Sequence, residues 1–540
     1  RGDELAEVIV TGTLRAQPLQ EVPASVTVLD AATLRDAGQQ HFQDVLELVP
    51  NLNWAAGTSR PRYFQIRGIG EREQYEGAPN PSVGFLIDDI DFSGLGMPAT
   101  LFDIGQIEVL RGPQGTHHGA NALAGLIVVR SNDPEPEAAY ALEASAGDHG
   151  MRSIGASATG PVAGNSAWRL SVQQYDSDGF LDNAALDRDD TNARDELSAR
   201  FKWRSWLARG GLLDVTLLHA DLDNGYDGWS LDNSRTTQTD APGIDRQRAQ
   251  AASLRWAQPL ASGNVFTTIG SFARSKTLYG YDYDWGNPAF WQPHVYDGVE
   301  DWDRTRRTGS LEVRLASPDA GDAGGLGWLV GAYALRLDEE GRYTSIGNYE
   351  DPVDPDWNWS DERVIDDDYE ATSLALFGQL DGRLNAAWRW SAGLRLEQRS
   401  ADYRDAGEVN GEAQASDFDA RDRMLGGQLA LTRHIGAASN VYAQVSRGYK
   451  AGGFNLGGVP DELRDFGPEY LWNFESGWRT LLGEGRGRAD VAVFYQRRKD
   501  QQVRSGRQLA GGGPYEFVTI NLPRGYTTGV EASLQYPLVP

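Results

Sequence analysis

The chain has 540 residues, and its 50 basic against 77 acidic residues give a formal net charge of −27 at pH 7. That charge excludes nucleic acid and anionic lipid as partners held by bulk electrostatics. The absence of cysteine excludes disulfides, thiolate metal sites and cysteine nucleophiles. No stretch reaches the roughly 18 consecutive apolar residues that a membrane-spanning helix needs, whereas 63 glycines, 21 tyrosines and 16 tryptophans suit a β-rich wall with aromatic belts.

An extended segment with β-branched residues at alternate positions lies close to the N-terminus, at residues 7–11. Nothing in the neighbouring sequence offers it a partner strand, so we expect a free extended edge that a strand of another protein can join. A frayed strand of the next domain is the alternative. Because the chain starts at Arg1 without a methionine or an apolar signal region, we also expect that an export signal has been removed.

Residues 21–135 predict a small α+β domain. Residues 25–30 form a strand that ends at Asp30, which can cap a helix reaching Gln40. A second short helix follows and ends at Pro50. Three further β-prone runs, YFQIR, VGFLI and IEVLR, predict a mixed sheet joined by long turns rich in Gly and Pro. The GIG triplet after the first of these runs leads into charged residues and not into a helix, which argues against a nucleotide-binding loop.

Four ordered motifs mark this domain. They are IRG at residues 66–68, an IDG-like turn at 87–89, IEVLRGPQG at 107–115 and a run of small residues at 121–125. Together they resemble the plug domain of TonB-dependent outer-membrane receptors. Two departures leave open what the plug touches: Asp89 stands where the family usually has glycine, and His117 and His118 stand where it more often has an apolar pair.

The resemblance implies roles for particular residues. It makes the N-terminal segment a TonB box, which TonB with the ExbB/ExbD complex would capture by strand addition, and whose residues are Glu7, Val8, Ile9, Val10 and Thr11. In the family, turns of the plug rise toward the outside and touch the ligand. The plug-side candidates for ligand contact here are Arg72, Gln74, Tyr75, Phe92 and Met97. Turns packed on the surrounding wall are the alternative.

From residue 136 to 540 the sequence repeats an alternation of polar and apolar residues. Between Trp388 and Leu396 the even positions are mostly apolar, while the odd positions include Arg389 and Arg395. Such a strand faces lipid on one side and water on the other, as in a transmembrane antiparallel β-barrel. A soluble β-sandwich would seldom leave a row of arginines opposite its core-facing side chains.

About sixteen strands are recognisable, separated alternately by short turns and by long loops that should face outside. The plugged barrel of the family has about 22 strands, and strings such as GPEYLWNFESGWR from Gly467 resemble its C-terminal half. We therefore expect a fragment truncated at its C-terminus. The first strand, near residues 140–146, and the last, near 527–536, should stand apart with unpaired edges, because a narrower closed barrel would not hold the plug.

The alternation also places two carboxylates in the lumen. Glu475 lies at a position of opposite parity to the aromatic residues of its strand, and so points to the other face. Glu531 likewise points to the face opposite Val530. The resemblance implies that these carboxylates meet the plug arginines Arg67 and Arg111. A carboxylate enclosed by a plug is costly when unpaired, and a guanidinium is its natural partner. Four separately hydrated lumen charges are the alternative.

The predicted outer loops combine aromatic and acidic residues. Their candidates for ligand contact are Trp229, Trp285, Trp291, Trp357 and Trp359. Stacking faces beside carboxylates suit a catecholate siderophore, a sugar or an aromatic compound. The acidic strings lack the spacing of an EF-hand loop, so a solvated acidic face is favoured over a calcium site. The scattered histidines disfavour a haem receptor, and we predict no catalytic residues, no metal site and no cofactor.

The sequence thus predicts a mainly β protein of the bacterial outer membrane: a transmembrane antiparallel β-barrel with an N-terminal α+β plug domain inside the lumen. Residues 1–20 would hold the TonB box and a linker, 21–135 the plug, and 136–540 a partial barrel in contact with outer-membrane lipid. The predicted function is TonB-dependent uptake of a scarce ligand, above all a ferric siderophore. Uptake of a carbohydrate or other organic nutrient is the alternative within transport, and a passive channel or an adhesin is the alternative from another class. We predict that the protein is not an enzyme.

Overall fold

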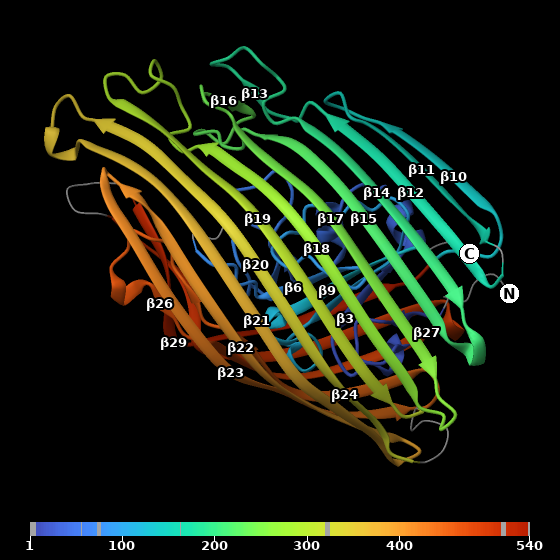
Figure 1. The fold of residues 1–540 in the computed structure, drawn as a ribbon. Helices are drawn as coiled ribbons and strands as arrows, with labels where there is room; N and C mark the ends of the chain where they lie inside the picture. The colour runs from blue at the N-terminus through green and yellow to red at the C-terminus, as the bar shows by residue number, and fades with distance from the viewer. Residues whose placement is uncertain are drawn as a thin grey trace.

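Sixteen antiparallel strands form one curved sheet, the wall, which surrounds the N-terminal domain (Figure 1). The computed structural model describes residues 7–55, 57–72, 77–162, 164–318, 325–508 and 515–537. The strands of the wall are β10 (Ala139–Ala146), β11 (Arg152–Val162), β12 (Ser166–Ser177), β14 (Arg194–Trp206), β15 (Leu212–Tyr226), β17 (Gly243–Pro259), β18 (Val265–Asp282), β19 (Val295–Ala316), β20 (Gly327–Glu350), β21 (Trp359–Asn385), β22 (Trp388–Val409), β23 (Glu412–Ile435), β24 (Ser439–Lys450), β27 (Glu469–Leu482), β28 (Gly487–Gln508) and β29 (Tyr515–Gln535). Each pairs with the next, so the predicted mainly β fold with about sixteen barrel strands is confirmed.

Side chains of the wall alternate between the lipid side and the lumen, as predicted. On β22, Leu394 and Leu396 are 53% and 56% exposed, whereas Arg395 between them is 1% exposed. On β27, Phe474 is exposed and Glu475 is buried. Because successive side chains of a strand point to opposite faces, the polar residues of these strands are collected on the lumen side.

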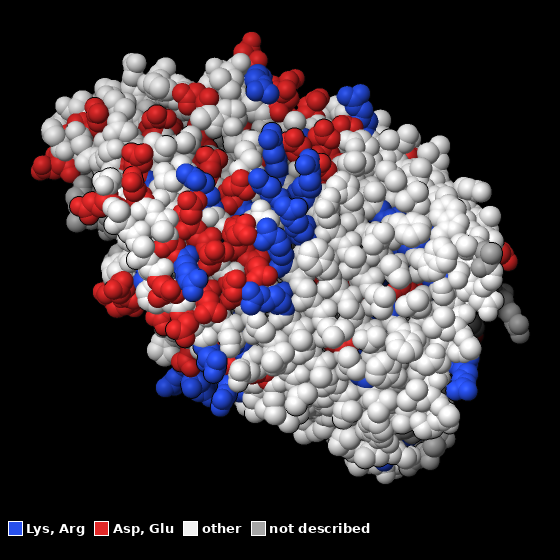
Figure 2. Space-filling view, in the orientation of Figure 1, with Lys and Arg blue, Asp and Glu red and all other residues white. Residues whose placement is uncertain are grey.

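Five consecutive strands of the wall, β19 to β23, are 22 to 27 residues long, which exceeds the roughly 9–11 residues that cross a bilayer. Figure 2 shows charged side chains gathered over the upper left of the wall, beside a broad field of uncharged residues. Residues 402–421 are not a loop but a hairpin of β22 and β23 that turns at Asn410 and Gly411, whose φ angles are 52° and 76°. Extended strands therefore replace part of the predicted loops.

The two outermost strands of the wall, β10 and β29, form no ladder with each other within the described residues. Every residue of β10 is exposed except Ser145, which is half-buried. The predicted separation of residues 140–146 from residues 527–536 is therefore confirmed. Among the described residues, the backbone groups along both edges lack the partners that a closed ladder would give them.

A five-stranded mixed sheet forms the middle of the plug, in the order β3-β8-β9-β6-β7. Its strands are β3 (Val26–Asp30), β6 (Val83–Ile87), β7 (Ile90–Asp91), β8 (Ile104–Arg111) and β9 (Gly125–Ser131), with β6 parallel to β9. Short two-residue pairs accompany the two sheets: β4 (Leu52–Asn53) with β5 (Gln65–Ile66), β13 (Asp182–Asn183) with β16 (Thr236–Thr237), and β25 (Gly453–Phe454) with β26 (Asp465–Phe466).

Three short α-helices flank the plug sheet: α1 (Ala31–Asp36), α2 (Phe42–Val45) and α3 (Gly115–His118). Asp30 caps α1 as predicted, since its carboxylate accepts from Thr33 N–H at 2.8 Å. The helix ends at Asp36 and not at Gln40, because the chain turns back there and Gly38 N–H donates to Arg35 O. Within the described ranges, none of the helices has the length and apolarity that crossing a membrane requires.

The N-terminal segment that was expected to be a free extended edge is paired, so that expectation was wrong. β1 (Ile9–Val10) forms a short antiparallel ladder with β2 (Gln17–Pro18). Val10 is fully buried, whereas Ile9 is 37% exposed. A ladder of two residues leaves no periodic pattern in the sequence, and for this reason the partner strand was not recognisable.

His41 caps α2 inside the plug core. Its Nδ1 accepts from Gln43 N–H at 3.2 Å, and its Nε2 lies 2.9 Å from Met97 O. A neutral ring with its hydrogen on Nε2 makes both contacts, whereas a protonated ring would lose the first one. Burial, helped by the charge of Arg60, lowers the pKa of His41 to about 3.

Acid should therefore weaken the plug. An unfolded histidine takes up a proton near pH 6.5 and buried His41 does not, so its contribution is complete above pH 6.5 and is lost as the pH falls toward 3, by about 2 kcal/mol at pH 5. Pulse proteolysis of the plug across a guanidinium series at pH 7.5, 6 and 5 measures this loss. His41→Gln should flatten the pH dependence, and the same decline in both proteins would show that His41 is not its source.

Candidate functional site

Four charged side chains from the plug and the wall meet on one side of the lumen. Arg67 Nη2 lies 2.8 Å from Glu475 Oε2 and 2.8 Å from Glu531 Oε2, and Arg111 Nε lies 3.1 Å from Glu531 Oε2. None of these side chains is more than 5% exposed. The structure thus brings together all four residues of the predicted charge cluster, and each buried carboxylate faces a guanidinium.

The backbone aims Arg67 at the wall. Arg67 follows β5 and adopts a φ of 55°, which a non-glycine residue keeps only where its surroundings hold it. Its guanidinium carbon lies 3.9 Å from the centroid of the Phe494 ring, within cation–π range. Burial lowers the pKa of Arg67, but the hydrogen bonds and charges of Glu531 and Glu475 outweigh burial and raise the pKa above its ordinary value. The guanidinium therefore stays charged.

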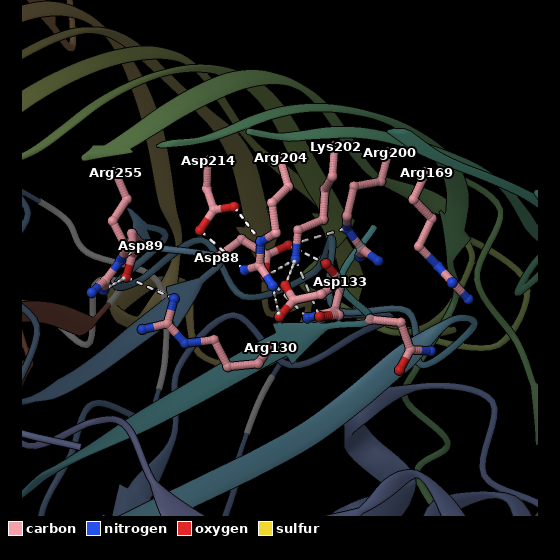
Figure 3. A network of polar contacts seen from close by, with 12 residues as sticks. Asp88, Asp89, Arg130, Asp133, Arg169, Arg200, Lys202, Arg204, Asp214 and Arg255 are labelled. Carbon is pink, nitrogen blue, oxygen red and sulfur yellow. Dashed lines mark hydrogen bonds and ion pairs between the residues drawn. The ribbon is translucent and has the colours of Figure 1, made fainter. Parts of the chain in front are cut away.

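A second set of ion pairs joins the plug to another part of the wall with the charges reversed (Figure 3). Here the plug supplies the carboxylates, and strands β12, β14 and β17 supply the cations. The pairs are Asp103–Arg169 (2.5 Å), Asp88–Arg200 (3.5 Å), Asp133–Lys202 (3.0 Å), Asp133–Arg204 (2.8 Å) and Asp89–Arg255 (2.8 Å). Complementary charges on plug and wall at both places favour one rotation of the plug in the lumen.

Asp89, which stands where the family usually has glycine, belongs to this second set. It keeps a left-handed backbone, with a φ of 71°. Its carboxylate contacts Arg130 of the plug at 2.7 Å and Arg255 of the wall at 2.8 Å. Burial alone would raise the pKa of Asp89, but the two arginines outweigh it and hold the pKa below its usual range. The aspartate thus adds a contact to the wall that glycine has no side chain to make.

Aromatic side chains meet the plug at Gly57. A Cβ built at Gly57 would lie 3.0 Å from Tyr279 Oη and 3.2 Å from Tyr226 Oη, so a larger residue here would push the two phenol groups outward. The same position lies 3.9 Å from the Trp229 ring, which is 42% exposed and stacks on Trp285 with the ring centroids 5.3 Å apart. We call these four aromatic residues the tip surface. Tyr226 and Tyr279 are its buried base, and Trp229 and Trp285 are its accessible part.

The other three predicted tryptophans lie apart from Gly57. Trp291 and Trp359 both pack on Tyr296, with ring centroids 5.2 and 6.2 Å from it. Trp357 is 50% exposed. Trp291 and Trp359 therefore pack in a different cluster from Trp229, which borders the plug at Gly57 with Trp285 stacked on it.

The plug-side candidates divide as well. Arg72 is exposed, and Gln74 and Tyr75 fall outside the described residues. Phe92 and Met97 are fully buried in the plug core, so the prediction that they contact the ligand is corrected: their side chains are inaccessible. Burying a large apolar side chain is worth about 1.5–3 kcal/mol, which explains why these turns fold inward.

Two buried arginines were missed by the sequence analysis. Arg60 pairs with both carboxylate oxygens of Glu196 on β14, at 2.7 and 2.8 Å, and Arg62 pairs with Asp245 on β17. The arginine side chains are 3% exposed. The string SRPR shortly before the IRG motif was the available signal, since two guanidiniums in an apolar turn need acidic partners.

The predicted TonB box leads into a strap, by which we mean residues 11–15. Glu108 of β8 accepts from the first two backbone N–H groups of the strap, at 2.9 and 2.7 Å. At the other end, Arg15 donates to Ser317 O at 2.7 Å, beside the connection of β19 to β20. The strap therefore ties the N-terminal segment both to the plug and to the wall.

A wall with separate lipid and lumen faces, filled by a plug that buried ion pairs hold in place, defines a plugged barrel of the outer membrane. The family profile described as "TonB dependent receptor-like, beta-barrel" matches residues 150–539, and the profile described as "TonB-dependent Receptor Plug Domain" matches residues 18–126. The chain belongs to the TonB-dependent receptor family and is a protein of the bacterial outer membrane. The resemblance seen in the motifs is confirmed.

Individual relatives are distant in sequence and similar in fold. The pesticin receptor of Yersinia pestis is 23% identical over 562 residues, covering 100% of this chain and 76% of that protein. The ferric yersiniabactin uptake receptor of Yersinia pestis superimposes with a TM-score of 0.80 at 19% identity, covering 96% of this chain and 77% of the other. The ferripyoverdine receptor of Pseudomonas aeruginosa, bound to ferripyoverdine, gives a TM-score of 0.73 at 18% identity, covering 100% and 72%.

Proposed function

We propose that this chain carries a ferric siderophore across the outer membrane in a TonB-dependent cycle. The observation that carries the proposal is the tip surface, where Tyr226, Tyr279 and Trp229 meet the plug at Gly57 and Trp285 stacks on Trp229. A ligand bound there would touch both the wall and the plug at once, so its binding would change the contacts of the plug. The similarity in fold to uptake receptors for ferric yersiniabactin and ferripyoverdine supports this class of cargo.

The chemistry of the tip surface favours siderophores whose chelating groups are aromatic. Phenol and indole rings offer flat faces for stacking and hydrogen-bond donors at their edges. Neighbouring rings are held in place, since Tyr281 and Tyr343 both donate to Glu300, the first at 2.6 Å. A catecholate or another aryl chelator would stack on such rings while its polar edge meets the phenol groups.

Energy coupling in this proposal begins at the TonB box, residues 7–11. β1 pairs with β2 through two residues only, so a strand from TonB has little backbone pairing to replace. The ExbB/ExbD complex would energise the pull on that strand. The box is continuous with the strap, and through the strap with both plug and wall.

Replacing Trp229 with alanine should weaken binding of the cargo about two- to twelvefold, because a lost aromatic contact is worth about 0.5–1.5 kcal/mol. Calorimetric titration of the purified protein with catecholate, hydroxamate and mixed ferric siderophores measures this and identifies the cargo. Trp206→Ala is the matched control, since Trp206 is also part-exposed (37%) but ends β14 at a short turn.

The same titrations also decide the class of cargo. Tight binding of one ferric siderophore by the unaltered protein and by Trp206→Ala, with weaker binding by Trp229→Ala, is the expected pattern. Binding of an oligosaccharide and of no siderophore would overturn the proposed cargo. Unchanged siderophore binding by Trp229→Ala would remove the tip surface as its site.

A further inference from the structure

Four basic side chains form a cluster on the lipid side of the wall, which we call the rim cluster. Its members are Arg248 of β17, Arg274 and Lys276 of β18, and Arg307 of β19. They share the strand parity of the exposed apolar residues Leu254, Phe272 and Leu311, so they point away from the lumen. Figure 2 shows Lys and Arg side chains in a column between the acidic part of the wall and the field of uncharged residues.

The rim cluster lies where the strands leave the hydrocarbon of the membrane. A tilted strand crosses it in about 9–11 residues. The short turn between β17 and β18 marks the periplasmic side, and Arg248 lies eleven residues from Pro259 and Arg274 nine residues from Val265, the strand ends at that turn. Two residues nearer the turn than Arg274, Phe272 is 52% exposed. The cluster therefore borders the apolar surface at the level of the outer headgroups.

Like charges lie directly opposite each other in this cluster. Arg248 is the register partner of Lys276 between β17 and β18, and Arg274 is the register partner of Arg307 between β18 and β19. Side chains in such positions start only about 4.5–5.5 Å apart, so two equal charges there destabilise the sheet. An anion from outside the chain would replace this repulsion with attraction.

Acidic side chains of the wall neutralise the rim cluster only in part. Arg248 pairs with Asp221 at 2.6 Å, Lys276 with Asp303 at 3.2 Å and Arg307 with Glu340 at 2.8 Å. Among the described residues, no acidic group lies within ion-pair distance of Arg274. Asp303 and Glu340 both lie further from the membrane than Arg307 does. The side of the cluster that faces the membrane therefore keeps an uncompensated positive charge.

We infer that the rim cluster binds the phosphate group of a lipid in the outer leaflet. Guanidinium groups pair with two phosphate oxygens at once, and a lysine adds a point charge. The acyl chains of the same lipid would cover Phe272 and Leu311, each 52% exposed, which free phosphate would leave bare. The net charge of −27 does not oppose this contact, because salt screens charges beyond about 8 Å. The inference does not depend on the cargo.

Native mass spectrometry of the detergent-solubilised protein, titrated with dioleoyl phosphatidic acid, tests the site. The unaltered protein should retain one lipid tightly. Arg274→Gln with Arg307→Gln should bind it about 30-fold more weakly, since each basic residue near an anionic lipid surface contributes about fivefold. The matched control is Arg342→Gln with Arg404→Gln, which removes two arginines that are 58% and 69% exposed further out on β20 and β22. It should bind the lipid like the unaltered protein.

Thermal unfolding in a neutral detergent separates lost binding from a damaged fold. Arg274→Gln with Arg307→Gln removes a repulsion between opposite positions, so without lipid this protein should unfold at the same temperature as the unaltered protein or at a higher one. Added phosphatidic acid should raise the unfolding temperature of the unaltered protein and not that of the double variant. Destabilisation of the double variant in the absence of lipid, with the same gain from lipid in both proteins, would overturn the inference.

Three results of the titration would also overturn it. One is equal binding of dioleoyl phosphatidylcholine, because the charge of its phosphate is balanced by choline. Another is the same loss of binding in the control variant, which would mean that surface charge in general attracts the lipid. The third is displacement of the lipid by an equal concentration of inorganic phosphate, which would make the cluster a site for the free anion.

Discussion

Deleting residues 7–11 should abolish accumulation of the siderophore in cells and leave its binding unchanged. The deletion removes the strand that TonB would join, whereas the tip surface lies elsewhere on the chain. Uptake of iron-55 presented as the ferric siderophore measures the first effect, and calorimetry on the purified protein measures the second. Accumulation that persists after the deletion would exclude active transport and favour a passive channel.

A single substitution separates capture by TonB from the strap, because the deletion also removes Thr11. Ile9→Pro takes away a backbone N–H and fixes φ; the lost ladder hydrogen bond is worth about 0.5–1.5 kcal/mol, so uptake should fall about tenfold. Ile9→Val keeps the extended backbone and a β-branched side chain, so uptake should stay close to that of the unaltered protein. Equal uptake by the two variants would mean that this segment is not captured by strand addition.

Glu531→Gln should loosen the plug by about 3–5 kcal/mol, because it leaves the buried guanidiniums of Arg67 and Arg111 with one carboxylate between them. Arg111→Met should be costly for the converse reason, since a carboxylate is then in excess. The guanidinium concentration at which the plug becomes sensitive to protease, while the wall stays folded, measures the change.

The double variant Arg111→Met with Glu531→Gln is the decisive control for the cluster. It removes one charge of each sign and keeps the contact of Arg67 with Glu475. The double variant should therefore be less destabilised than the sum of the two single variants. Strictly additive losses would show that the four charges do not act as one cluster.

Most of what the sequence determined came from the alternation of apolar and polar residues along the strands. It placed Leu394 toward lipid and Arg395 in the lumen, and it placed Glu475 and Glu531 where plug arginines reach them. Such a pattern is local, because the two faces of a strand meet different solvents whatever the strand pairs with. Together with the ordered plug motifs, it was sufficient for the fold class, the family and the charge cluster.

Tertiary structure alone decided which charges meet and which side chains remain accessible. Phe92 and Met97 lie in turns that the sequence indicated as exposed, yet the plug core encloses them. Asp89 contacts Arg255, which lies 166 residues away in the chain. Thr11 of the strap contacts Glu108, which lies 97 residues away. Contacts over such separations leave no periodic trace in either segment, because they depend on how the plug is rotated inside the wall. Complementary ion pairs between plug and wall favour that rotation, and they exist only once both domains are folded.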